Sequence, residues 1–307
     1  MVKNLLHESN VSYDINRGNI MLTIEVKQDS LKFTAAHSSK GNQLKWEQDG
    51  WWYKADEFGY ESLAEAVTSH LLSKSNMEGI TIYEPVLILY KGIAYRGCRS
   101  KNFRGQREAI ITLERFIRAY TGTGLAKQLA RIYDVKERIC FTEEFVRKIA
   151  GLENFGEYIV KLMEMDAFFL NEDRHTNNIS LIYNVDTDVY HLCPFYDMGL
   201  SLFADTRVKF PLNMDYFGCK EKITAKPFSR DFDEQLDAAN ELYGCHLKFN
   251  FPANRIADVI LELKEQYLLT EEDVAEGRVD GYTEQEFRRV EDTLRYQASK
   301  YKYMFQE

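Results

Sequence analysis

The stretch that decides the fold is LNEDRHTNNISLI, Leu170–Ile182. It places acids, an arginine, a histidine and asparagines directly before an apolar segment with the composition of a β-strand. Such a stretch is either an Asx-rich connection between a helix and a strand or a site of chemistry. The residues on either side of it distinguish the two interpretations.

The composition is that of a globular protein. The chain has 307 residues, 45% of them hydrophobic, which is enough to bury one large domain or two lobes. No run of 18 apolar residues is present, and the N-terminus has no apolar signal-peptide core. The five cysteines are scattered without a CxxC pair, which argues against disulfide and zinc frameworks. We expect a cytoplasmic protein without a membrane span.

Net charge limits the partners. The chain carries 48 acids against 39 bases, a formal net charge of −9. Binding to nucleic acid through counterion release needs a basic surface. We therefore expect no direct contact with nucleic acid.

The first third of the chain has mostly β patterning. A hairpin is predicted at Gln43–Asp56, with Asp49-Gly50 as its turn. Apolar spacing then predicts a helix over Tyr60–Leu72. Further strands are predicted at 19–26, 30–36, 80–90 and 92–100, the last two joined at Lys91-Gly92.

The pattern becomes helical after Gln106. Helical spacing is found in 107–120, 124–133, 142–152, 155–170, 233–244, 254–268 and 282–305. Thr142 is predicted to cap the third of these helices. A second hairpin is expected at 179–197. The prediction is a bilobal α+β fold with a boundary near Lys101–Gly105, a β-rich N-lobe over 1–103 and a mostly helical C-lobe over 104–307.

The second hairpin predicts which polar residues meet. With Thr187-Asp188 as a two-residue turn, antiparallel pairing places Asn178 opposite Asp197. Amide and carboxylate oxygens are ligands that suit Mg²⁺. Asp173 and His175 lie just before this hairpin, and either side chain could act as a base.

The internal spacing is typical of phosphoryl transfer. Asp173 and Asn178 are five residues apart, as are the catalytic Asp and metal-binding Asn of the protein-kinase H-R-D-L-x-x-x-N loop. Asp197-Met198-Gly199 follows a predicted strand, as D-F-G does. This reaction needs an acid to orient the acceptor hydroxyl and oxygen ligands for the metal.

DRHTNN followed by YDMG resembles the D-R-H-x-x-N and D-x-G signatures of the phosphatidylinositol 3/4-kinase-like fold. Within that fold, the chain is similar to the compact bacterial serine/threonine protein kinases of the HipA and CtkA type. The resemblance implies that ATP and Mg²⁺ are cofactors. Asp173 would be catalytic, His175 catalytic or supporting, and Asn178 and Asp197 metal ligands. Asp166, on the apolar stripe of the preceding helix, is interpreted as a structural brace for this loop.

The resemblance extends to the N-terminal half. Lys54 matches the lysine that contacts the ATP phosphates in such kinases, although strand propensity alone would make it an exposed lysine. Glu65 matches the acid that positions this lysine, and Glu61, one turn earlier, is the alternative.

Two further segments are assigned to nucleotide binding by resemblance alone. The loop His37–Lys45 resembles the HipA phosphate loop, with Ser38, Ser39 and Gly41 as cofactor-binding residues and an autophosphorylated serine near Ser38. Gly97–Phe103, with Arg99 and Lys101, takes the place of the hinge whose backbone meets adenine.

The predicted function is ATP- and Mg²⁺-dependent phosphorylation of a serine or threonine in a protein substrate. The alternatives are a lipid or small-molecule kinase of the same fold, and a pseudokinase that binds nucleotide or a partner, because the phosphate loop has one glycine and lacks G-x-G-x-x-G. The resemblance also implies a toxin-antitoxin setting with an antitoxin-like partner. The alternative location is that of a secreted effector without a Sec signal.

Overall fold

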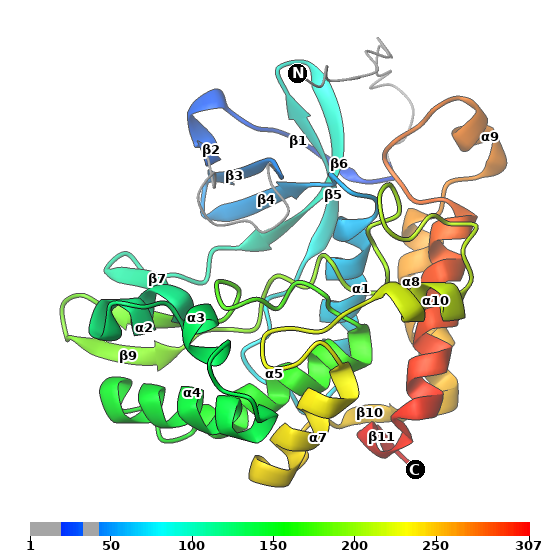
Figure 1. The fold of residues 1–307 in the computed structure, drawn as a ribbon. Helices are drawn as coiled ribbons and strands as arrows, with labels where there is room; N and C mark the ends of the chain where they lie inside the picture. Colours follow the sequence, from blue (N-terminus) through cyan, green and yellow to red (C-terminus); the bar gives the residue numbers. More distant parts are fainter. Residues whose placement is uncertain (1–19, 33–42) are drawn as a thin grey trace, which may run out of the picture.

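The computed structural model describes residues 20–32 and 43–307. Its largest sheet has six strands in the order β1-β5-β6-β4-β3-β2 and is built from the N-terminal part of the chain (Figure 1). These strands are β1 (Leu22–Glu25), β2 (Leu31–Lys32), β3 (Lys45–Gln48), β4 (Trp51–Ala55), β5 (Glu84–Tyr90) and β6 (Ile93–Lys101). β1 pairs with β5 in parallel, and the other neighbours are antiparallel.

Both turns predicted in this sheet are confirmed. The Asp49-Gly50 turn joins β3 to β4, with φ values of 53° and 77°. The Lys91-Gly92 turn joins β5 to β6, with φ values of 53° and 76°. Two-residue turns with positive φ at both positions suit the right-handed twist of paired strands. One consequence matters for the site: β3 places Lys45 directly opposite Lys54 of β4.

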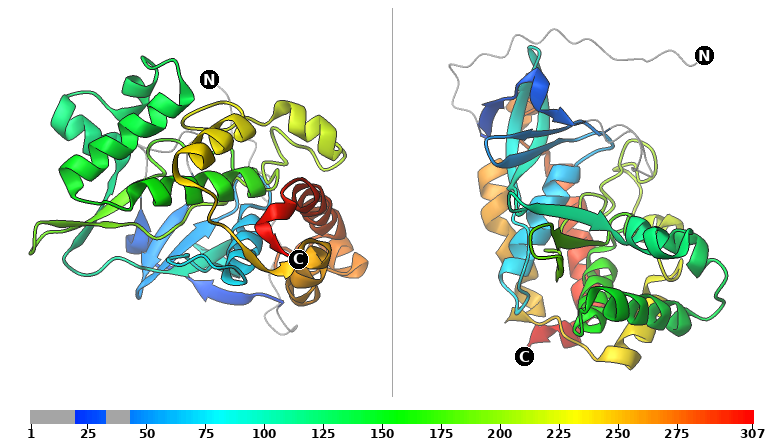
Figure 2. Two further views of the ribbon diagram at one scale, coloured as in Figure 1. Left: turned by 90° about the horizontal axis from the view of Figure 1, so that it is seen from below. Right: turned by 90° about the vertical axis from the view of Figure 1, so that its left-hand side faces the viewer.

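Helix α1 (Glu61–Ser73) packs against β5 and β6, and its predicted position is confirmed. Nearly all its side chains are buried, including both glutamates considered as partners of Lys54. Burial is this extensive because α8 (Ile256–Tyr267) packs beside α1, and α10 (Glu284–Lys300) packs in turn against α8 (Figure 2). The C-terminal helices therefore support the part of the chain that carries the large sheet.

The remaining helices are α2 (Leu113–Thr121), α3 (Leu125–Leu129), α4 (Val135–Ala150), α5 (Phe155–Phe169), α6 (Tyr216–Lys222), α7 (Phe232–Tyr243) and α9 (Glu271–Ala275). The predicted cap at Thr142 is wrong. α4 begins seven residues earlier, where the Asp134 side chain accepts the amide N–H of Glu137 at 2.9 Å. Thr142 lies inside the helix, and its hydroxyl donates to the carbonyl oxygen of Arg138 at 2.9 Å.

A second sheet has the order β7-β8-β9, formed by β7 (Glu108–Thr112), β8 (Ser180–Asn184) and β9 (Val189–Leu192). Helical spacing over 107–120 is therefore a wrong prediction for its first half. Ile110 pairs with Ile182, so Glu108–Thr112 gains strand partners that its local sequence does not reveal. α2 starts only at Leu113, after Thr112, whose side chain accepts the amide N–H of Arg115.

The predicted register of the β8–β9 hairpin is also wrong. Asn184 pairs with Val189, which shifts the pairing by two residues and removes Asn178 from direct opposition to Asp197. The cause is the Asn184 side chain, which accepts the amide N–H of Asp186 at 3.0 Å and that of Thr187 at 3.2 Å. This Asx turn stabilises a four-residue loop in place of the two-residue turn.

The α+β, bilobal fold is confirmed, and the two parts share one core. Buried side chains of α1, α5 and α10 belong to the same hydrophobic cluster. Arg96 of β6 adds a polar connection, since its guanidinium donates to Glu286 of α10 at 2.8 Å. A short third sheet, β10 (Phe249–Pro252) with β11 (Phe305–Gln306), lies near the C-terminus (Figure 1). The domain boundary near Lys101–Gly105 stays a prediction.

Candidate active site

A cavity of about 210 Å³ lies between the large sheet and the segments around β8 and β9. Six of the residues predicted to form the site line it, namely Lys54, Glu65, Asp173, His175, Asn178 and Asp197. They come from β4, α1, the loop after α5 and the segment after β9. Residues up to 143 positions apart in the chain thus meet at one cavity.

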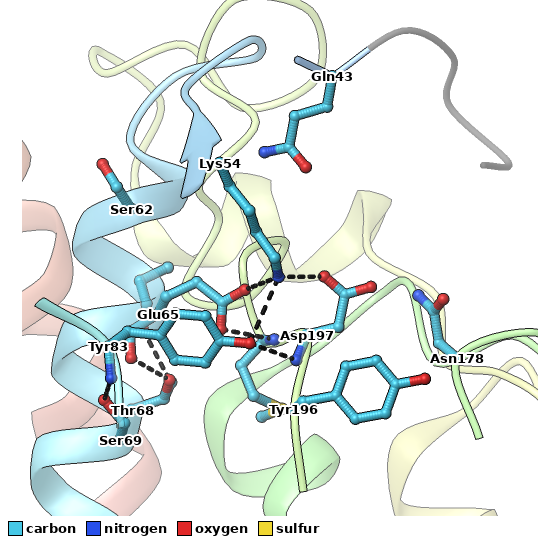
Figure 3. A network of polar contacts seen from close by, with 12 residues as sticks. Gln43, Lys54, Ser62, Glu65, Thr68, Ser69, Tyr83, Asn178, Tyr196 and Asp197 are labelled. Carbon is cyan, nitrogen blue, oxygen red and sulfur yellow. Dashed lines mark hydrogen bonds and ion pairs between the residues drawn. The ribbon is translucent and has the colours of Figure 1, made fainter. Parts of the chain in front are cut away.

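Lys54 is the centre of a buried ionic network (Figure 3). Its ammonium group donates to Oε1 of Glu65 at 2.7 Å and to Oδ1 of Asp197 at 2.8 Å. The Lys54 side chain is 12% exposed and that of Glu65 only 2%. Strand propensity alone describes Lys54 wrongly, because the lysine points into the cavity and not into solvent.

The network shifts the pKa values of Lys54 and Asp197 so that both groups stay charged. Burial by itself would lower the pKa of Lys54, but Asp197 and Glu65 outweigh burial and raise this pKa well above its usual value. Burial would likewise raise the pKa of Asp197, but Lys54 and Lys45 hold it well below the usual range. The lysine therefore stays protonated and the aspartate ionised at neutral pH.

The structure resolves the choice between the two glutamates of α1. Glu65 contacts Lys54 through one oxygen, and its other oxygen accepts the amide N–H of Met198 at 2.9 Å. Glu61 instead accepts the backbone N–H groups of the three residues 57–59 at 2.6–2.9 Å. Glu65 is thus the partner of Lys54, and Glu61 organises the chain that leads into the helix.

Tyr83 lies behind the cavity residues Lys54 and Asp197, and no sequence motif identifies it. Its hydroxyl lies 3.4 Å from the Lys54 ammonium and 3.4 Å from the amide nitrogen of Asp197. Its own amide N–H donates to the hydroxyl of Ser69 on α1 at 3.2 Å. Tyr83 therefore links α1, Lys54 and the Asp197 segment, as Figure 3 shows.

The loop that carries Asp173 is held in place by a buried ion pair. Asp166 of α5 is fully buried and accepts the guanidinium of Arg174 at 3.0 Å and the side-chain amide of Asn171 at 2.9 Å. Arg174 is itself 1% exposed. A buried carboxylate is tolerated when it is paired and hydrogen-bonded in this way. This geometry fits the structural role predicted for Asp166.

Arg174 also explains why Asn178 and Asp197 lie near each other although the hairpin register was wrong. One of its nitrogens, Nη1, donates to the carbonyl oxygen of Asn178 and to that of Tyr196, both at 3.0 Å. The guanidinium thus joins the two chain segments beyond the last pair of the hairpin. Asp197 follows directly with a φ of 63°, a conformation that aspartate adopts more readily than most residues.

The side chains of Asn178, His175 and Lys226 approach the carboxylate of Asp173. The Asn178 amide donates to its carbonyl oxygen at 2.9 Å and lies 3.4 Å from its Oδ2. His175 Nε2 is 3.7 Å from Oδ2, and the Lys226 ammonium is 3.3 Å from Oδ1. Asp173 therefore lies between the cavity residues and a lysine of a distant segment.

His175 faces Asp173 with a defined ring nitrogen. Its Nδ1 accepts the amide N–H of Asn177 at 3.2 Å, so the proton of the neutral ring is on Nε2. Burial lowers the pKa of His175, Asp173 opposes this effect, and Lys226 adds to it. The neutral ring is thus favoured at pH 7, which suits a residue that orients Asp173.

Two predicted cofactor-binding residues lie elsewhere. Arg99 donates to Glu84 at 2.6 Å and stacks over Trp51, and Lys101 lies 5.8 Å from the same ring. Neither lines the cavity. Within the predicted hinge, Gly97–Phe103, the first three residues are paired on both sides, with β4 and with β5.

The remaining predicted residues, Ser38, Ser39 and Gly41, lie outside the described residues. The end of the same predicted loop is described, and it contributes Lys45, which lines the cavity. Sequence reasoning missed Lys45, although the predicted Asp49-Gly50 turn places it opposite Lys54. The cavity therefore has two cations on adjacent strands.

Comparisons with known proteins identify the fold. No protein-family model matches the sequence, and no curated protein does. A solved structure of the Helicobacter pylori proinflammatory kinase CtkA matches with a TM-score of 0.58 and 13% sequence identity, over 91% of this chain and 95% of that one. At this identity the match shows the fold alone. The expected CtkA-like kinase fold is confirmed.

HipA of Shewanella oneidensis MR-1, solved with HipB and its operator DNA, is also similar. The TM-score is 0.41 with 12% identity, over 88% of this chain. The match covers 62% of the HipA chain, so this chain spans less than two thirds of HipA. In the described part of this chain, no helix is long and apolar enough to cross a membrane.

Proposed function

We propose that this protein is an ATP- and Mg²⁺-dependent kinase that phosphorylates a serine or threonine hydroxyl of a protein. The observation that carries the proposal is the arrangement of Lys54, Glu65 and Asp197 on one side of the cavity and of Asp173 and Asn178 on the other. Phosphoryl transfer requires this division between phosphate binding, metal binding and orientation of the acceptor. The likeness to CtkA, which is named as a kinase, supports the same reaction.

The cations of the cavity suit an anionic nucleotide. Lys54, held by Glu65, would contact the α- and β-phosphates, and Lys45 on the neighbouring strand adds a second positive charge. Pairing with Glu65 would keep Lys54 in position when Asp197 binds Mg²⁺. The two lysine side chains could thus bind the phosphates without the backbone of a glycine-rich loop.

The donor set also fits Mg²⁺. Asn178 uses its amide nitrogen on Asp173, which leaves its oxygen as a ligand, and Asp197 supplies an ionised carboxylate. Among the described residues no three His, Cys, Asp or Glu side chains form a metal cluster. Mg²⁺ is commonly held by one or two protein oxygens together with phosphates and water, so Asn178 and Asp197 suffice. Bound there, the ion would neutralise charge on the phosphates.

Asp173 would act on the acceptor. Its carboxylate orients the hydroxyl and accepts the hydroxyl proton as the new bond from oxygen to the γ-phosphorus forms. The bond from the γ-phosphorus to the β,γ-bridging oxygen breaks, and ADP leaves. The contacts of Asn178 and His175 with Asp173 would hold the carboxylate in one orientation.

The test is transfer from γ-labelled ATP with protein and lipid acceptors side by side. We expect label in protein only, loss of label with EDTA, and a loss of about 10³-fold or more in Asp197→Ala. Asp186→Ala, which removes an exposed aspartate paired with Arg107 outside the cavity, is the control and should keep its activity. Full activity in Asp197→Ala would contradict the mechanism. Labelled lipid would change the acceptor class, and nucleotide binding without transfer would favour the pseudokinase.

A further inference from the structure

A second pocket, of about 280 Å³, lies on the other side of the catalytic loop. His175 lines both this pocket and the nucleotide cavity. The second pocket also contains Thr176 of the same loop and Ala126 and Leu129 of α3. The carbonyl oxygen of Asp173 accepts the amide N–H of His175. Asp173 therefore lies between the cavity suited to phosphates and the second pocket.

Lys226 connects this pocket to Asp173. It belongs to the segment between α6 and α7 and lines the pocket, while its ammonium lies 3.3 Å from Oδ1 of Asp173. Its side chain is 37% exposed, so water and ligands can reach it. Exposed ion pairs are weak enough to be exchanged for a contact with a ligand.

The charged groups of the pocket are mainly basic. Arg138 lines it and donates to two carbonyl oxygens, those of Ile132 and Phe228. Among the ion pairs of the described residues there is none that neutralises Arg138. The carboxylate of Glu114 lies nearby, but it already accepts hydrogen bonds from the Thr176 hydroxyl, the Ala126 amide and the Arg118 guanidinium.

We infer that this pocket binds the acceptor segment, and that Lys226 recognises a carboxylate next to the acceptor hydroxyl. The inference rests on the proposed function. The hydroxyl must reach Asp173 from the side away from the nucleotide, and the second pocket opens there. A neighbouring acidic side chain would replace Asp173 as the partner of Lys226, which leaves the Asp173 carboxylate to the hydroxyl. The exposed side chain of Ala126 and the Arg138 cation complete a site for an acidic peptide.

The experiment compares three peptides that share one serine and differ only in the flanking residue, which is Glu, Gln or Lys. The readout is the ratio of kcat/KM values between peptides, which removes any general loss of activity. Wild-type protein should prefer the Glu peptide to the Lys peptide by about two- to fivefold, as expected for a partly exposed ion pair. Lys226→Met should abolish the preference, and Lys226→Glu should invert it. Lys148→Glu, an equal charge change on an exposed residue of α4 outside the pocket, should keep it.

Two outcomes would overturn the inference: equal rates for the three peptides in the wild type, or an equal loss for all of them in Lys226→Met. The second would mean that Lys226 acts on Asp173 or the transferred phosphoryl group. If no peptide is labelled, the proposed function fails, and fluorescence anisotropy of a labelled Glu peptide decides the inference. Binding that is lost in Lys226→Glu supports the pocket, and unchanged binding overturns it.

Discussion

Lys54 and Lys226 both pair with an aspartate of the candidate site, but in different surroundings. Lys54 is 12% exposed and contacts two carboxylates, whereas Lys226 is 37% exposed and pairs with Asp173. Lys54 lies on β4 of the large sheet, and its partner Glu65 lies on α1. Lys226 comes from a segment between two helices. A buried network of this kind supports the fold and keeps Lys54 in place for the proposed nucleotide, whereas an exposed pair can be replaced by the proposed substrate.

Stability should separate the two lysines most clearly. Lys54→Met leaves Glu65 and Asp197 without their cation, and loss of one partner of a buried pair costs about 3–5 kcal/mol. Lys226→Met is the matched control, because the same substitution removes an exposed pair worth at most about 1 kcal/mol. Chemical denaturation of both variants measures the free energies of unfolding. Equal losses would contradict the contrast between the two regions.

A smaller effect is expected from Tyr83→Phe. The hydroxyl lies 3.4 Å from both Lys54 and the amide of Asp197, so each contact is long and weak. Loss of the hydroxyl should lower kcat/KM about fivefold, which corresponds to about 1 kcal/mol. The ring still covers Lys54, so stability should change little. Wild-type kinetics would show that Tyr83 does not position the network.

The smallest expected effect is a change in the pKa of His175, and it tests the acceptor side of the site alone. Burial lowers the pKa of His175, Asp173 opposes burial, and Lys226 lowers the pKa further. Removal of a positive charge favours protonation, so Lys226→Met should raise the pKa of His175 toward its usual value. Titration of the histidine ring signals by NMR measures this, with His175→Gln for assignment. His70, whose pKa is lowered by burial and by Lys74, serves as the unchanged reference. A lower or unchanged pKa of His175 would place Lys226 too far away to act on it.

The chain order and the kinase-type spacing predicted three of the residues that line the cavity. Asp173, Asn178 and Asp197 are recognisable because each role needs one residue type at a set distance along the chain. Lys54 and Glu65 came from resemblance, since a strand lysine has no local feature that reveals burial. The cytoplasmic location and the antitoxin-like partner stay predictions.

The features that were missed depend on long-range contacts. Tyr83 reaches Lys54 only through the packing of its segment on α1. Lys226 lies 53 residues after Asp173, in a segment without a motif. The β8–β9 register depended on the Asn184 side chain, which a two-residue turn rule ignores. The correct neighbourhood of Asn178 and Asp197 followed from a buried arginine, not from the hairpin that predicted it.

The central claim is that Asp173 acts on the acceptor while the opposite side of the cavity binds the nucleotide. Asp173→Asn keeps the shape of the side chain but removes its charge. The decisive measurement is single-turnover phosphate transfer by this variant, with Mg-ATP affinity determined on the same sample. We expect affinity close to wild type and a loss of about 10²–10⁴-fold in the transfer rate. Transfer at the wild-type rate would contradict the account.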